Sequence, residues 1–242
     1  MNGCGGLRPI LASIMLVLCL AAASHSIDDA KPARAIRVWV ADGAADGAIA
    51  KRLKKLKFDV IAVTWDKLDP REAEPGEVIF LATHWGDEAA YPLLEKQKDA
   101  LDKFIQRGGG LLASQPNRTF TPALLPYPIT FENGYDAKQP DKSNLAQDHF
   151  ITEDLADEDM PFPHDQMSNL DPRYRILAKQ KSTDSPSLVV CNYGDGRIVV
   201  QTNNETYAAE IKIGDEILRR MIVWAAGREP RSKDKKPQIE HR

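Results

Sequence analysis

Hydrophobic and polar positions follow two alternating patterns along the first half of the chain. Short apolar runs such as residues 78–82 are typical of strands that are buried on both faces of a sheet. Longer segments such as 93–106 carry apolar side chains at three- and four-residue spacing, which predicts amphipathic helices. Their order favours an α/β fold, in which helices cover both faces of a parallel sheet. The expected strands are 36–40, 58–64, 78–82 and 111–114, and the expected helices are 44–57 and 93–106.

The last third of the chain has the pattern of a β-hairpin followed by a closing helix. Two apolar runs flank Tyr193-Gly194-Asp195-Gly196, whose residue types are those of a tight turn. Apolar positions then recur at helical spacing over 206–226, and Gly227 is expected to end that helix. The expected strands of this part are 174–178, 187–192 and 197–202.

Composition and segment boundaries predict a single domain over 27–227. With 242 residues, of which 43% are hydrophobic and 28% charged, the chain has enough apolar side chains for one core. Within it, residues 116–147 are rich in proline and show little periodicity, so we expect an irregular excursion that covers the sheet edge. Residues 228–242 are polar and mildly basic, which predicts a disordered tail. The net charge of −3 without a clustered basic face gives no reason to expect nucleic acid as a partner.

Residues 1–26 have the pattern of a secretory signal peptide. Arg8 precedes an apolar run at 10–23, which ends in three alanines. We therefore expect export to the periplasm or the extracellular space, with no membrane contact once the segment is cleaved. An uncleaved segment that anchors the chain in the membrane is the alternative.

Cleavage of that segment would remove two of the three cysteines, Cys4 and Cys19. An intramolecular disulfide is then excluded in the mature chain, because only Cys191 is left. Cys191 ends the apolar run 188–191, so we expect a buried structural thiol.

Four segments resemble motifs of the class I glutamine amidotransferase-like superfamily, and within it the ThuA-like (trehalose-utilisation-type) group. They are FIQRGGGLL at 104–112, DHFIT at 148–152, YGDGRIVV at 193–200 and LRRMIVWAAG at 218–227. The resemblance implies a flavodoxin-like three-layer sandwich with a mostly parallel sheet, a C-terminal β-hairpin and a closing helix. It also implies a site above the carboxyl ends of the strands.

The position that carries the nucleophilic cysteine in glutamine amidotransferases matches Gln115 in this chain. A glutamine side chain has no nucleophilic atom, so covalent thiol catalysis is excluded at that position. The expected function is therefore that of an exported, non-catalytic amidotransferase-like domain, which binds a small polar ligand, such as a carbohydrate, or a protein partner that the sequence does not identify.

Seven residues are the predicted ligand contacts: Asp42, His84, Trp85, Gln115, Asn117, His149 and Asp165. The first six lie at strand ends or within these motifs, and Asp165 loosely matches the position of the acidic Asp-Glu segment of the resembling family. Three have a structural alternative, because Asp42 would cap a helix, His84 would pack on Trp85, and His149 would cap the segment after the excursion. No catalytic residue, cofactor or metal is assigned, since no pair of histidines has zinc-type spacing. The alternative function is a periplasmic sugar-processing enzyme of ThuA-like type, with His84 or His149 as acid or base. A scaffolding protein is a third hypothesis.

Overall fold

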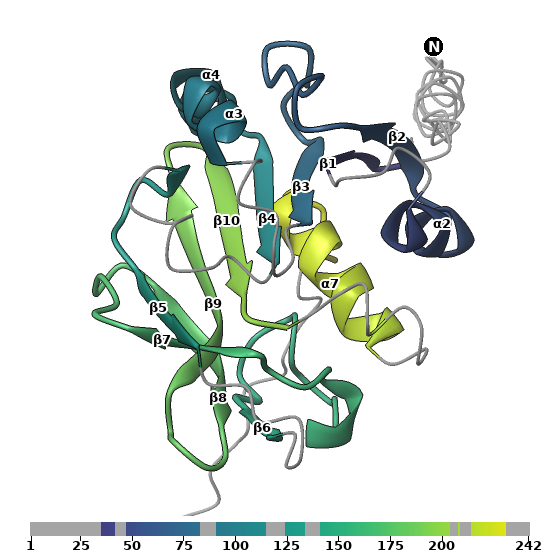
Figure 1. Ribbon diagram of the computed structural model, residues 1–242. Helices are drawn as coiled ribbons and strands as arrows, with labels where there is room; N and C mark the ends of the chain where they lie inside the picture. Colours follow the sequence, from purple (N-terminus) through teal and green to yellow (C-terminus); the bar gives the residue numbers. More distant parts are fainter. Residues whose placement is uncertain are drawn as a thin grey trace, which may run out of the picture. The chain divides into compact units, whose positions relative to one another are not determined.

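The alternation of strands and helices builds one eight-stranded sheet, in the order β2-β1-β3-β4-β10-β9-β8-β6 (Figure 1). The computed structural model describes residues 35–41, 47–82, 91–114, 124–133, 141–203, 208 and 214–230, all of which belong to the unit that begins at Ala35. The strands of the sheet are β1 (Arg37–Ala41), β2 (Asp59–Val63), β3 (Val78–Ala82), β4 (Gly110–Ser114), β6 (Ser143–Leu145), β8 (Arg175–Gln180), β9 (Pro186–Tyr193) and β10 (Gly196–Gln201).

The sheet has a parallel part and an antiparallel part, which meet at β10. Strands β2, β1, β3, β4 and β10 run in the same direction. Strands β9, β8 and β6 continue the sheet with antiparallel pairings, and the β9-β10 hairpin is the predicted one. Its turn contains Gly194 in a left-handed conformation with φ of 60°, as a tight hairpin turn requires. The carboxyl ends of the five parallel strands therefore share one edge of the sheet.

Helices cover both faces of this sheet, which confirms the predicted three-layer sandwich. On one face, α2 (Ala48–Lys55) and α7 (Asp215–Ala225) bury residues such as Leu53 and Ile222 against Val40, Phe80 and Leu112. On the other face, α3 (Tyr91–Lys96) buries Leu94 and α4 (Lys98–Gln106) buries Leu101 and Phe104, against strand residues that point the opposite way. Adjacent residues of β4 alternate between the two cores, as the pleat of a strand demands.

Two of the predicted helices differ from the observed ones. Residues 91–106 form two helices, α3 and α4, which are separated at Gln97. The closing helix α7 begins at Asp215, because Gly214 precedes it in a left-handed conformation with φ of 76°. Only Ala208 of the residues between 204 and 213 is described. The spacing of apolar residues does not reveal such a break, because the helical period is recognised only over a window of many residues.

The proline-rich segment contains regular structure that the sequence pattern did not predict. Strand β5 (Thr130–Asn133) pairs with β7 (Asp165–Ser168) in a second, two-stranded sheet, and β6 adds to the edge of the main sheet. The β5-β7 ribbon packs on β9 (Figure 1). These strands have three or four residues each, which is too short for period-2 alternation to stand out. A 3-10 turn at Asp157–Asp159 lies between them and was not expected either.

One close approach and one buried thiol complete the core. A Cβ atom on Gly110 would lie 2.6 Å from the Ala225 carbonyl oxygen, so the first residue of β4 lets α7 approach the sheet. Cys191 is buried and free, as predicted. Of the helices in the described ranges, none has both the length and the apolar character that a membrane span needs.

Candidate functional site

Two polar residues end the central parallel strands on the same face of the sheet. Ser114 is the last residue of β4 and Gln201 the last of β10, and the two are register partners. Both follow strands of apolar residues, and both are almost completely buried. In open α/β sheets, ligands bind outside the carboxyl ends of the strands, so this is the edge at which a site is expected.

Asn203 joins the two strand ends just beyond β10. The Ser114 hydroxyl donates a hydrogen bond of 2.8 Å to the Asn203 main-chain carbonyl. The Asn203 amide in turn donates through Nδ2 to Gln201 Oε1, at 3.0 Å. All three side chains are at most 1% exposed, so their polar atoms depend on partners inside the protein.

The segment that leads into β7 brings Asp165 beside this strand end. Pro163 and Asn203 form an antiparallel bridge, and the main-chain N–H of His164 donates to the Thr202 carbonyl at 3.0 Å. The main-chain carbonyl of Asp165 accepts a 2.6 Å hydrogen bond from Gln180 Nε2, at the end of β8. We call the group of Ser114, Asp165, Gln201 and Asn203 the carboxyl-edge cluster.

Two acceptor atoms of this cluster are buried without a hydrogen bond. Within the described part of the chain, Asp165 Oδ2 and Asn203 Oδ1 are the buried side-chain polar atoms that have no partner. Asp165 is only 5% exposed, and Asn203 is fully buried. Since an unsatisfied buried polar group costs about 1–3 kcal/mol, such atoms in a folded protein call for an explanation. A buried water molecule, or a ligand hydroxyl that enters the cluster, would supply the missing donors.

Burial also changes the acid–base properties of this region. It raises the pKa of Asp165 to about 6, because the charged carboxylate is poorly solvated there. Burial lowers the pKa of the neighbouring His164 for the corresponding reason, as the charged imidazolium is disfavoured. Asp165 is therefore a carboxyl group that changes its protonation state near neutral pH, while His164 is neutral there.

Five of the seven predicted contact residues lie outside the described residues: Asp42, His84, Trp85, Gln115 and Asn117. In sequence, each follows a described strand within a few positions. Asp42 comes directly after β1, His84 is the second residue after β3, and Gln115 comes directly after β4. Whether they share a pocket stays a prediction.

The two described members of the predicted set lie at different ends of β10. Asp165 belongs to the carboxyl-edge cluster. The His149 ring packs on Trp224 with 5.4 Å between the ring centroids, and Arg197 near the start of β10 lies over the same indole. At about 3.3 Å per residue, the strand between Arg197 and Thr202 separates these surroundings by roughly 16 Å.

His149 has the capping role that the sequence suggested as its structural alternative. Its carbonyl accepts hydrogen bonds from the N–H groups of Thr152 and Glu153, and its Nδ1 accepts the Ile151 N–H at 3.2 Å. Burial lowers the pKa of His149 to about 4, with a further contribution from Arg175. Such a ring is neutral at physiological pH and has one nitrogen already occupied, which makes it a poor general acid or base there.

Ser114, Gln201 and Asn203 are not among the seven predicted contact residues. The signal for them is the same one that selected Gln115, since an apolar strand passes abruptly into polar residues at Gln201-Thr202-Asn203. The hairpin motif predicts the turn before β10 and does not extend to the residues at the end of that strand.

Neither Ser114 nor Cys191 is an accessible nucleophile of the kind that acyl transfer needs. The Ser114 hydroxyl is buried and donates to a carbonyl, and burial raises the pKa of the Cys191 thiol to about 12. The described ranges contain no group of three His, Cys, Asp or Glu side chains that would hold a metal ion. What the cluster offers chemically is acceptor oxygens and one titratable carboxyl.

Solved structures with a similar fold come from several microorganisms. A cytoplasmic protein from Salmonella typhimurium LT2 matches with a TM-score of 0.57 and 12% identity, over 78% of this chain and 98% of its own. A glutamine amidotransferase from Thermotoga maritima matches with a TM-score of 0.55 and 13% identity, over 79% and 98%. A candidate GMP synthase component from Thermoplasma acidophilum has a TM-score of 0.52 and 15% identity, over 80% and 95%.

These similarities establish the fold and nothing finer, because the identities are low. Neither a protein-family model nor a curated protein sequence matches the chain. The chain has a glutamine amidotransferase-like α/β fold, as the resemblance of its motifs implied. A shared fold does not determine chemistry, which depends on the residues at the site of this chain.

Proposed function

We propose that this protein binds a small polar ligand rich in hydroxyl groups, of which a carbohydrate is the favoured class, at the carboxyl-edge cluster. The observation that carries the proposal is the pair of buried acceptors without partners, Asp165 Oδ2 and Asn203 Oδ1. Hydroxyl groups donate to carboxylate and amide oxygens, and a sugar offers several donors at short spacing. The position at the carboxyl edge of the parallel strands supports a ligand site.

We also propose that the protein does not catalyse the amidotransferase reaction. The sequence has Gln115 where the resembling ThuA-like and amidotransferase motifs lead to the catalytic residue. In the described residues, buried Ser114 and Cys191 offer no replacement nucleophile. Export through residues 1–26 is also part of the proposal, and a periplasmic or extracellular protein of this kind would meet free saccharides. Glutamine hydrolysis by the purified protein that is lost on Gln115→Ala would contradict the non-catalytic part.

Binding is tested by titrating the purified protein with a panel of neutral monosaccharides, disaccharides and linear polyols. We expect saturable binding of at least one member. Asn203→Leu removes the acceptor without adding charge and should weaken that binding about tenfold or more, since it leaves a ligand hydroxyl without its partner. Asn144→Leu, at an exposed position of β6, is the matched control and should bind as the wild type does. Circular dichroism of both variants establishes that they are folded.

One observation favours a second candidate function, a sugar-processing enzyme. The pKa of Asp165, raised to about 6, is near the range that suits a general acid or base. If the acid or base is a histidine, it is His84. His149 is unsuited to that role, because its pKa is lowered to about 4 and its Nδ1 already accepts a hydrogen bond. Turnover of aryl glycosides by the wild type that is abolished in Asp165→Asn would favour the enzyme over the binding protein.

A further inference from the structure

A basic pocket lies on the face of the sheet that α4 covers, away from the α7 face on which Ser114 and Gln201 lie. It is formed between α4 and the loop that joins β2 to β3, and its volume is about 480 Å³. Sites for small molecules typically measure about 300–1,000 Å³. Four cationic side chains line this pocket together with a single acid, Asp99. They are Arg71, Lys96, Lys103 and Arg107.

The two guanidinium groups are held in place by the β2–β3 loop. Arg71 makes a bidentate contact with Asp69, with Nε and Nη2 at 2.8 and 2.7 Å from the two carboxylate oxygens. Arg107 donates from Nη2 to the Ala73 carbonyl, and its guanidinium lies 6.0 Å from the centre of the Phe104 ring. Each keeps further N–H groups for which the described residues provide no partner, so the pocket has oriented donors before anything binds.

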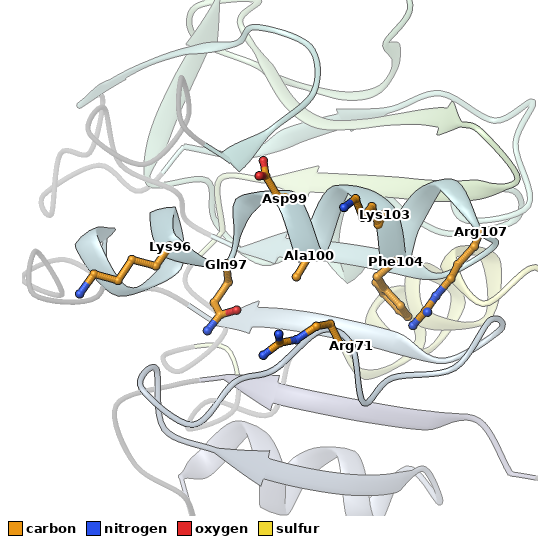
Figure 2. A pocket seen from close by; sticks show the side chains of 8 residues that line it. All are labelled: Arg71, Lys96, Gln97, Asp99, Ala100, Lys103, Phe104 and Arg107. Atoms are coloured by element: carbon orange, nitrogen blue, oxygen red, sulfur yellow. The ribbon is translucent and has the colours of Figure 1, made fainter.

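The two lysines make no ion pair with a described residue, although Asp99 lines the same pocket. Lys96 and Lys103 are both exposed. Figure 2 shows Arg71 opposite the side of α4 that carries Gln97 and Ala100. Arg71 is already paired with Asp69, but Lys96, Lys103 and Arg107 make no ion pair within the described residues. Their positive charges repel one another, and an anion in the pocket would relieve that repulsion.

We propose that this pocket binds a small molecule that carries a phosphate or diphosphate group. A phosphoryl group brings up to two negative charges and three strong acceptor oxygens, which match two lysine ammonium groups and the remaining N–H groups of the arginines. A single carboxylate would neutralise only one of the four cations. The half-buried Ala100 provides the apolar part of the lining, against which the rest of an organic phosphate would pack, and the buried Phe104 ring supports this part of the helix from below.

The proposal does not depend on the carbohydrate site, since the two regions share no residue. It is tested by isothermal titration of the purified protein at low ionic strength with two probes, inorganic pyrophosphate and glycerol 3-phosphate. We expect one-to-one binding of at least one probe, weakened by added salt. Tighter binding of pyrophosphate would identify a site for free phosphates, and tighter binding of glycerol 3-phosphate a site for phosphate esters.

The double variant Lys96→Ala/Lys103→Ala should weaken that binding about tenfold or more, because it removes two charge-assisted contacts. The control Lys54→Ala/Lys55→Ala removes the same charge from exposed positions on α2 and should change the affinity less than about twofold. Equal losses in the two double variants would show attraction by net charge alone and would overturn the proposal. Failure of the wild type to bind either probe would overturn it as well.

Discussion

The hydroxyl of Ser114, at the end of β4, donates a 2.8 Å hydrogen bond to the main-chain carbonyl of Asn203, beyond the end of β10. The two residues are 89 positions apart in the sequence. The bond fastens the chain that leaves β10 to the neighbouring parallel strand. It thereby fixes the place of Asn203, whose side chain carries one of the two buried acceptors without a partner.

Replacing Ser114 with alanine should destabilise the protein by about 1–2 kcal/mol, because the buried Asn203 carbonyl loses a donor. The free energy of unfolding, measured by urea denaturation, checks this expectation. Ser168→Ala is the matched control, since the Ser168 hydroxyl donates to Glu132 at an exposed site. A loss above about 0.5 kcal/mol is not expected there. Equal losses in the two variants would argue against a structural role for the Ser114 bond.

The free energy of unfolding should depend on pH through Asp165. Its pKa is about 6 in the folded protein against about 3.8 when unfolded, so the folded state binds more protons between these values. The contribution of Asp165 to stability is then greatest at low pH and decreases as pH rises from about 4 to above 6. Two pH units correspond to about 3 kcal/mol, so Asp165→Asn should be more stable than the wild type at pH 7.5 by up to about that amount.

The advantage of Asp165→Asn should vanish below about pH 4, where the wild-type carboxyl is protonated in both states. Asp154→Asn is the control, because Asp154 is exposed and its left-handed backbone suits asparagine. Its stability relative to the wild type should change little with pH. If the difference for Asp165→Asn were the same at pH 3.5 and 7.5, burial would not be the cause of its effect.

The imidazole of His149 should titrate with a pKa of about 4, against about 6.5 for a solvated histidine. The unfolded chain then binds more protons between pH 4 and 6.5, so this residue lowers stability as pH falls through that interval. Nuclear magnetic resonance of the ring protons measures the midpoint directly. A midpoint near 6.5 would show that the ring is not held against Trp224.

Gly110→Ala should destabilise the protein by about 3 kcal/mol, because the new methyl group would collide with the Ala225 carbonyl and displace α7. Gly227→Ala is the control that has backbone strain but no collision. A Cβ atom at Gly227 would have no neighbour within 4 Å, but its φ is 68°. We therefore expect only the cost of placing alanine in a left-handed conformation, about 1 kcal/mol. Thermal unfolding of both variants measures the difference. Equal losses would mean that β4 and α7 adjust at little cost.

The sequence predicted the sandwich because its strands and helices are long enough to show their periods. The run at 78–82 coincides with β3, and the hairpin around Gly194 has unambiguous turn residues. The short strands β5, β6 and β7 were missed. Their stability comes from partners such as Met167 for Phe131, which are distant in sequence, and not from a local pattern.

The candidate site was predicted less completely than the fold. Asp165 was selected from a loose motif match, and the structure places it in a buried polar cluster. Its neighbour Asn203 was not selected, because the pairing of Pro163 with Asn203 joins two segments that no local pattern connects. Burial also lowers the pKa of His149 to about 4, and no sequence pattern indicates the packing that causes it.

The central claim is that Asp165 takes part in binding a small polar ligand at the carboxyl edge of the parallel strands. The most direct measurement is an equilibrium titration, at pH 7.5, of the wild type, Asp165→Asn and Asp154→Asn with the saccharide and polyol panel. We predict that at least one compound binds the wild type and Asp154→Asn equally, and that its affinity for Asp165→Asn is lower by about tenfold or more. Binding that is unaffected by Asp165→Asn, or the absence of binding to the wild type, would contradict the claim.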